Sequence, residues 1–267
     1  MENTTFLELI RQNPYTLTSI KNPTDEMKLL AVKRNGLMLK HIKNPTSEME
    51  QIALENNSRA IEFIESPTEA MMQKAITASW TNLEYLNNPP ATIIEQAINQ
   101  SGWAIKYIKN PSEALQLLAV NKNYDAIKFL KEPTEQVQLA AITHSYEALR
   151  YIKAPTPQAE RLAVSQNERA IQLINDLTKP KILEFLAMNF LVIKYVMKEI
   201  SVEELRQVLQ TQLAKPDISK KYVRDFLTYT TIDKLSPIMA IDRLLLIDQY
   251  GSCTAKRIAV DEQLKLL

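Results

Sequence analysis

Glycine is scarce in this chain, with 3 residues among 267. Sheet sandwiches, barrels and dinucleotide-binding folds need many glycine-rich turns, so this composition argues against those fold classes. At the same time, 45% of the residues are hydrophobic, which is enough to bury a sizeable core. The composition therefore predicts a helical protein.

Cysteine and histidine are also scarce, with 1 Cys and 2 His. Cys253 has no partner for an internal disulfide, and no Cys/His spacing is typical of a zinc site. We therefore expect no metal and no cofactor, and a reducing, cytoplasmic location. The opening segment MENTTFLELIRQ has no basic stretch followed by an apolar one. Because no apolar run approaches the ~20 residues of a membrane span, no membrane association is expected.

Neither sign of charge dominates, since Lys+Arg 32 nearly balance Asp+Glu 31. Any attraction to nucleic acid or to an anionic membrane would have to come from a local patch of basic residues.

The chain has instead a repeat of 22 residues, and a fixed period of this length is typical of a solenoid. Proline returns at this interval at Pro23, Pro45, Pro67, Pro89, Pro111, Pro133 and Pro155. When each proline is counted as position one, position nine is always alanine: Ala31, Ala53, Ala75, Ala97, Ala119, Ala141 and Ala163. A residue this small at every repeat marks a close approach of two helices.

Each repeat is predicted to contain two helices. The first begins at a hydroxyl residue at position two, which caps free backbone amides, and acidic residues follow in its first turn. These hydroxyl residues are Thr24, Thr46, Thr68, Ser112, Thr134 and Thr156. The second helix begins at the Asn or Ser of position thirteen and buries positions sixteen, seventeen and twenty. The next Asn-Pro or related dipeptide ends it, because the residue before proline is disfavoured in a helix.

The register extends beyond the prolines to residues 1–22 and 177–198, which makes about nine units. We predict an all-α fold, a right-handed α-solenoid of 22-residue two-helix repeats over residues 1–198. Residues 199–267 are predicted to form a C-terminal helical cap or a small helical domain. There, one helix should begin at the capping box Ser201–Glu204, and another should run from Ser236-Pro237 to Gly251.

The unit NPTxExxxLAVxxNxxAIxxI, seen at 110–130 and 132–152, resembles short helical-hairpin repeats known as a domain of unknown function in bacterial and phage proteins. It is more loosely similar to leucine-rich-repeat-variant and HEAT-like α-solenoids. The resemblance covers residues 1–198 and implies a scaffold in phage or mobile-element biology that binds and inhibits a host protein. It carries no catalytic residues, and a single cysteine cannot hold the metal cluster that accompanies some leucine-rich-repeat variants.

The sequence contains no motif that indicates an enzyme. Walker, GxGxxG, G-x-S-x-G and His-rich metal patterns are absent, and the acids recur at helix starts, where the helix dipole accounts for them. His41 and His144 occupy different repeat positions, so we do not expect them to face one another. A catalytic role is not predicted.

Position nineteen forms a near-continuous aromatic column: His41, Phe63, Tyr85, Tyr107, Phe129, Tyr151, then Leu173 and Tyr195. With a period of 3.6 residues, this position lies roughly 100° from the centre of the apolar stripe. The rings either seal adjacent repeats or form a half-exposed ladder of anchors for a partner.

Positions eighteen and twenty-one are basic in three consecutive units, which polarises the chain locally. If stacked helices lie about 10 Å apart, this basic stretch is roughly 20–30 Å long. It is interleaved with aromatic rings and bordered by two tryptophans, so it is either a solvated helix face or a surface that binds a partner. The candidate partner-binding residues are Lys106, Tyr107, Lys109, Lys128, Phe129, Lys131, Arg150, Tyr151, Lys153, Trp80 and Trp103.

The sequence thus favours a non-enzymatic scaffold for a protein partner, with a host factor as the partner that the resemblance implies. The alternative is a nucleic-acid-binding helical repeat protein that uses the basic and aromatic residues of 106–153. The pattern does not indicate the oligomeric state.

Overall fold

The computed structural model describes residues 2–265, and these residues form α-helices and 3₁₀ helices without a β-strand. The predicted all-α solenoid of 22-residue repeats is confirmed. The α-helices of the repeats are α1 (Glu2–Gln12), α2 (Asp25–Arg34), α3 (Ser47–Asn56), α4 (Glu69–Ala78), α5 (Ala91–Gln100), α6 (Glu113–Lys122), α7 (Glu135–His144), α8 (Pro157–Gln166) and α9 (Lys179–Met188).

The second element of each repeat is a short 3₁₀ helix. These elements are η1 (Pro14–Ser19), η2 (Gly36–His41), η3 (Ser58–Phe63), η4 (Trp80–Tyr85), η5 (Gly102–Tyr107), η6 (Tyr124–Phe129), η7 (Tyr146–Tyr151), η8 (Glu168–Leu173) and η9 (Phe190–Val192), the last followed by α10 (Ile193–Val196). The C-terminal helices are α11 (Val202–Leu213), α12 (Lys220–Thr228), α13 (Arg243–Tyr250) and α14 (Cys253–Leu264).

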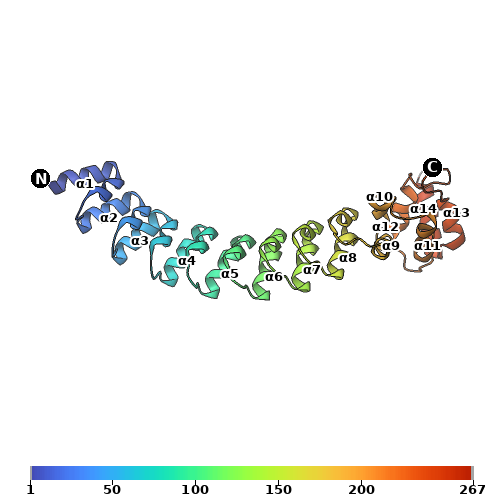
Figure 1. Ribbon diagram of the computed structural model, residues 1–267, viewed down its shortest axis with the longest axis horizontal. Coiled ribbons are helices and arrows are strands. Elements are labelled where there is room, and N and C mark those ends of the chain that lie inside the picture. The colour runs from blue at the N-terminus through green and yellow to red at the C-terminus, as the bar shows by residue number, and fades with distance from the viewer. Residues whose placement is uncertain (1, 266–267) are drawn as a thin grey trace. The chain divides into compact units, whose positions relative to one another are not determined.

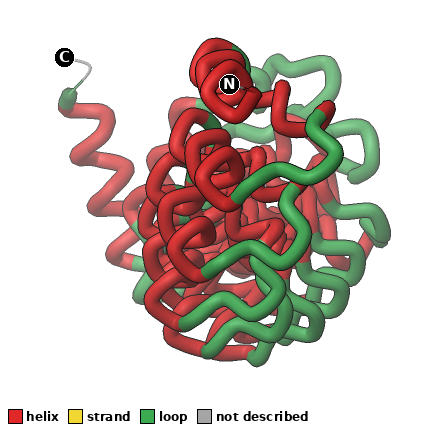
Figure 2. The backbone as a smooth tube through the Cα atoms, turned by 90° about the vertical axis from the view of Figure 1, so that its left-hand side faces the viewer, coloured by secondary structure: helices red, strands yellow, loops and turns green. Residues whose placement is uncertain are grey.

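The chain divides into two compact units between Lys131 and Glu132. The first unit contains α1–α6 with η1–η6, and the second contains α7–α14 with η7–η9. Within each unit the α-helices of successive repeats lie side by side (Figure 1), and the loops that join the repeats gather away from those helices (Figure 2). In the second unit α11 packs on α9 and α12 packs on η9, so the C-terminal helices contact the last repeat directly.

The residues predicted to cap the repeat helices do so, with the exception of Asn123, whose side chain accepts from the amide of Gly102 instead of capping η6. All six hydroxyl residues at position two precede an α-helix and accept a hydrogen bond from the backbone amide three residues later. The Asn or Ser of position thirteen ends the α-helix and begins the 3₁₀ helix, as Asn35 does by accepting from the amide of Leu37. At Asn35 the backbone amide closes the α-helix by donating to the carbonyl of Ala31, and the side chain caps the 3₁₀ helix.

The alanines at position nine lie at the centre of the core. All seven are 0% exposed, as are the aliphatic residues that follow them at Val32, Ile76, Ile98, Val120, Ile142 and Val164. The 3₁₀ helix of the preceding repeat packs on the α-helix at this point, as η5 does on α6, so the two backbones lie close together. At Gly102, for example, an added Cβ would lie 2.2 Å from the carbonyl oxygen of Ala119.

The second helix of each repeat differs from the expected α-helix, because its backbone bonds run from residue i to i+3. In η5 the amide of Ala104 donates to Ser101, and the amide of Ile108 donates to Ile105, which closes the element at both ends. A 3₁₀ helix rises about 2.0 Å per residue, whereas an α-helix rises about 1.5 Å. Six residues in a 3₁₀ helix therefore span a greater length of the ten-residue α-helix beside them. The expected period of 3.6 residues is therefore wrong for this element, and the period is 3.0.

The Asn-Pro turns use a backbone conformation that asparagine tolerates well. Asn44, Asn88 and Asn110, each directly before a repeat proline, have φ of 49°, 49° and 51°. Asparagine is enriched in this left-handed region because its short polar side chain bonds locally. At these three junctions the Asn-Pro dipeptide thus turns the chain between one repeat and the next.

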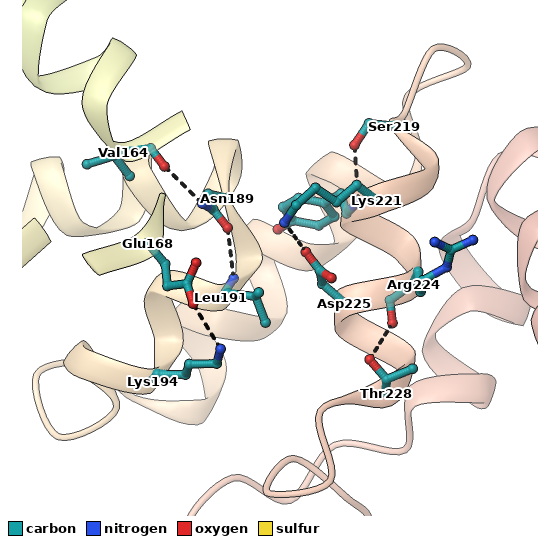
Figure 3. Close-up of polar contacts among 11 residues, drawn as sticks. Val164, Glu168, Asn189, Leu191, Lys194, Ser219, Lys221, Arg224, Asp225 and Thr228 are labelled. Atoms are coloured by element: carbon teal, nitrogen blue, oxygen red, sulfur yellow. Dashed lines mark hydrogen bonds and ion pairs between the residues drawn. The ribbon is translucent and has the colours of Figure 1, made fainter. Parts of the chain in front are cut away.

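Buried polar side chains join neighbouring repeats. In the second unit Asn189 donates to the carbonyl of Val164 at 2.9 Å and accepts from the amide of Leu191 at 3.2 Å (Figure 3). In the first unit Asn82 donates to Ser58 Oγ at 3.0 Å and to the carbonyl of Ala75 at 2.9 Å. These bonds give the buried side-chain amides of Asn82 and Asn189 hydrogen-bond partners.

The C-terminal segment agrees with one predicted helix start and contradicts the other. The capping box at Ser201 and Glu204 is present and begins α11. The helix expected from Ser236-Pro237 begins instead at Arg243, because Asp242 caps it by accepting from the amide of Leu245. Ser236 uses its hydroxyl in a local turn, where it accepts from the amide of Met239 at 3.1 Å. Gly251 ends α13 as predicted.

Within the described residues, the search for a helix both long enough and apolar enough to cross a membrane finds none.

Candidate binding surface

The 3₁₀ geometry sorts the side chains of each short helix into three rows, because residues i and i+3 lie one above the other. Positions seventeen and twenty form the buried row, and position sixteen is buried beneath the ring of position nineteen. Positions fifteen and eighteen form the outer row. The lysines of position eighteen therefore lie at the surface, next to the aromatic rings of position nineteen.

In the first unit Lys106 lies over two aromatic rings. Its Nζ is 4.5 Å from the ring centroid of Tyr107 and 5.5 Å from that of Trp80, which belongs to the preceding repeat. The two rings are themselves 6.2 Å apart and tilted by 42°. Contacts of this kind attract the cation to the electron-rich faces of the rings.

The next repeat has a second cluster of the same kind. Lys128 Nζ lies 4.5 Å from the ring of Trp103 and 5.1 Å from that of Phe129. Asp125 completes this cluster, since it accepts from Trp103 Nε1 at 2.7 Å and from Lys128 Nζ at 2.8 Å. We call the surface formed by Trp80, Trp103, Lys106, Tyr107, Asp125, Lys128 and Phe129 the cation–aromatic ridge.

The rings of the ridge are neither core nor fully exposed. Trp103 is 39% exposed and Phe129 is 37% exposed, while Trp80 and Tyr107 are half-buried. The column at position nineteen thus both packs against neighbouring repeats and presents ring surface to solvent. Both lysines are exposed.

The Asp125 carboxylate has a perturbed pKa. Burial by itself raises the pKa of Asp125, but the hydrogen bonds from Lys128 and Trp103 and the charge of Lys128 outweigh it. The pKa of Asp125 therefore lies below its ordinary value of 3.8, and the carboxylate is charged near neutral pH. A negative charge is fixed in the middle of the predicted basic stretch.

The remaining candidate residues lie apart from these clusters. Lys109 and Lys131 are exposed in the loops after η5 and η6, outside the two clusters. Arg150, Tyr151 and Lys153 are exposed and belong to the second unit. The structure thus brings together six of the candidates, and it describes the other five as exposed residues outside the ridge.

The same relation between consecutive repeats holds elsewhere with other chemistry. In the first unit Arg59 lies 5.3 Å from the ring of Tyr85 in the following repeat. In the second unit Glu168 binds Lys194 of the following repeat at 3.0 Å (Figure 3). The scaffold is therefore constant, and the side chains at these positions vary.

Sequence reasoning missed Asp125. A signal was present, since an acid three residues before a lysine is stacked beneath it in a 3₁₀ helix, but the α-helical period concealed this pairing.

Among residues 2–265, no group of three or more His, Cys, Asp or Glu side chains could hold a metal ion. No protein-family model, curated protein or solved structure matches this chain. Inference about function therefore depends on the geometry of the ridge.

Proposed function

We propose that the chain is a non-enzymatic scaffold that binds an acidic protein partner through the cation–aromatic ridge of its first unit. The observation that carries this proposal is the placement of two lysine ammonium groups over half-exposed rings in consecutive repeats. Tryptophan and tyrosine are enriched among the residues that dominate protein interfaces. Following the resemblance of the repeats, the partner would be a host protein that a phage or mobile element inhibits.

The occupied ring faces favour a protein over single-stranded nucleic acid. Bases bind such proteins by stacking on aromatic faces, but here the ammonium groups of Lys106 and Lys128 already lie over those faces. A base would have to displace a lysine from its ring before it could stack. An acidic side chain approaching the Lys106 ammonium group from solvent displaces no ring, whereas at Lys128 it would share the ammonium group with Asp125.

The charge of the ridge supports the same choice. Asp125 offsets one of the two ammonium groups and lies within 2.8 Å of Lys128. Phosphate backbones are bound by accumulating lysines and arginines, so a fixed carboxylate in the path opposes that mode of binding. Protein surfaces, in contrast, match mixed charges one by one.

The test is capture of a partner from a lysate of cells that express the chain, with and without nuclease. The baits are the wild type, the double variant Lys106→Glu/Lys128→Glu, and the control Lys40→Glu. Lys40 is an exposed lysine at the same repeat position in η2, but no aromatic contact is described for it. Circular dichroism should be unchanged in all three, because exposed substitutions shift stability by less than about 0.5 kcal/mol each.

We expect a protein that survives nuclease on the wild type and on Lys40→Glu, and that is lost from the double variant. Added salt should weaken its capture, since rim charges act mainly on the association rate. A partner that disappears after nuclease would favour the nucleic-acid alternative. Equal capture by the double variant would place the interface away from the ridge.

A further inference from the structure

A pocket of about 400 Å³ lies in the first unit, among its first two repeats. It is lined by the end of η1 and the turn after it, by the end of η2 and the turn after it, and by Lys28 of α2. Four of its lining residues have basic side chains, namely Lys21, Lys28, His41 and Lys43. Among the described residues that line it, none is acidic and none belongs to the cation–aromatic ridge.

Positive charge is in excess at this pocket. Lys28 is the half-buried member of the basic set, and its ammonium group lies 2.8 Å from the carboxylate of Asp25. That carboxylate is 75% exposed and is not part of the lining. Lys21 and Lys43 form no ion pair with the residues that the structure describes. Three ammonium groups less one carboxylate leave two positive charges at the pocket.

Elsewhere in the chain the corresponding place is closed by the side chain at position six, which Lys28 occupies in its own repeat. Gln138 holds this position in α7, where it donates to the carbonyl of Pro133 and accepts from the amide of Thr156. Its side chain thereby joins the two turns on either side of it. Lys28 pairs instead with Asp25, and a pocket is present between its two turns.

The repeat that follows the pocket has acids at two equivalent positions. Glu50 occupies position six there and Glu65 occupies position twenty-one, and partial burial together with the charge of Glu65 raises the pKa of Glu50. Positions six and twenty-one of one repeat are therefore close enough for their charges to interact. Lys28 and Lys43 hold these positions at the pocket. Since the next repeat accepts acids at both, packing does not require lysine at either one.

We infer that this pocket binds the phosphate group of a small organic phosphate monoester. Such a group has about two negative charges near neutral pH, which match the two positive charges of the lining. Lysine suits it because the ammonium group is a compact charge with three donors. The pocket lies within the range of about 300–1,000 Å³ that ligand sites usually enclose. Leu17, Ile20 and Ile42 also line it and provide an apolar surface for the organic part of the ligand.

Isothermal titration calorimetry with phenyl phosphate as the probe tests this inference. Benzoate has the ring with a single negative charge, and inorganic phosphate lacks the ring. The wild-type chain should bind phenyl phosphate at least about tenfold more tightly than benzoate, because a further hydrogen bond between charged groups has about that effect. Inorganic phosphate should bind more weakly than phenyl phosphate, since it leaves the apolar lining uncovered.

Two variants use residues that other repeats already have at the same positions, so circular dichroism should be unchanged. Lys28→Gln introduces the residue of Gln138 and should weaken the binding of phenyl phosphate at least about tenfold. Lys43→Glu introduces the residue of Glu65 and should abolish detectable binding, because it cancels the excess positive charge. The matched control is Lys40→Gln, at an exposed lysine of η2 outside the pocket, and it should bind like the wild type.

The ridge variant Lys106→Glu/Lys128→Glu should also bind phenyl phosphate like the wild type, which separates this inference from the proposed function. A wild-type chain that does not bind phenyl phosphate would overturn the inference. Unchanged affinity in both Lys28→Gln and Lys43→Glu would overturn it as well, because the phosphate would then be bound elsewhere. Equal affinities for phenyl phosphate and benzoate would show a general anion site and contradict the assignment to a phosphate group.

Discussion

Replacing Gly102 with alanine tests the close contact between η5 and α6. Gly102 begins η5 and its backbone lies directly on α6. An added Cβ would be 2.2 Å from the carbonyl oxygen of Ala119 and 3.2 Å from the amide nitrogen of Asn123. Because both of these are backbone atoms, no side-chain rotation can make room.

Two effects of opposite sign decide the outcome. The described glycines do not have positive φ, so alanine fits the backbone and should stabilise by about 0.4–1 kcal/mol through the unfolded state. Overpacking costs about 1–3 kcal/mol, and moving η5 away weakens the bond from the Gly102 amide to Asn123 Oδ1, worth about 0.5–1.5 kcal/mol. That bond is 2.8 Å long in the wild type. We therefore expect a net loss of about 0.5–4 kcal/mol.

Urea unfolding followed by circular dichroism measures this difference. Gly36→Ala should behave in the same way, since its Cβ would lie 2.3 Å from the carbonyl oxygen of Ala53. Solenoids unfold through neighbouring interfaces, so the transition should broaden as well as move to lower urea. If both variants were as stable as the wild type or more so, conformational entropy would outweigh packing and the close contact would be relaxed in solution.

Two further predictions concern capping and pH. Thr134→Ala should lower the free energy of unfolding in urea by about 1 kcal/mol, because α7 loses its capping bond. Thr178→Ala is the control and should lower it clearly less, because the Thr178 hydroxyl makes no capping bond to α9. Equal losses of stability in the two variants would contradict the assignment of the cap. The pKa of Asp125 is lower in the folded chain than in the unfolded chain. The ionised carboxylate therefore stabilises the fold fully above pH 3.8, and this stabilisation is lost as the pH falls through the lowered pKa. Tryptophan emission should report this acid transition through Trp103, and a transition unchanged in Asp125→Asn would contradict the role of its bonds to Trp103 and Lys128.

The sequence predicts well those parts of the fold in which a repeat position requires one type of residue for one structural reason. Alanine at position nine must be small because backbone lies against it, and the hydroxyls of position two must accept from a first-turn amide. Asn or Ser at position thirteen must end one helix and begin the next. Such constraints recur unchanged every 22 residues and are therefore visible without a structure.

The type of the second helix was not predictable from its apolar pattern. An α-helix advances by about 100° per residue and a 3₁₀ helix by about 120°, so six residues distinguish them poorly. Positions sixteen, seventeen and twenty are buried under either period. The choice depends on how far a six-residue segment must reach along its ten-residue neighbour, which is a property of packing.

The error in the period also explains why the candidate site was only partly predicted. With three residues per turn, position fifteen lies beneath position eighteen. The residue types at these two positions therefore determine whether a cation there forms an ion pair with a carboxylate. Arg59 with Glu62 and Asp125 with Lys128 form ion pairs at 3.1 and 2.8 Å. Trp103 occupies position fifteen beneath Lys106, and there the lysine lies over aromatic rings instead. The residue types at positions fifteen and eighteen therefore determine whether the cation of a repeat is paired with a carboxylate.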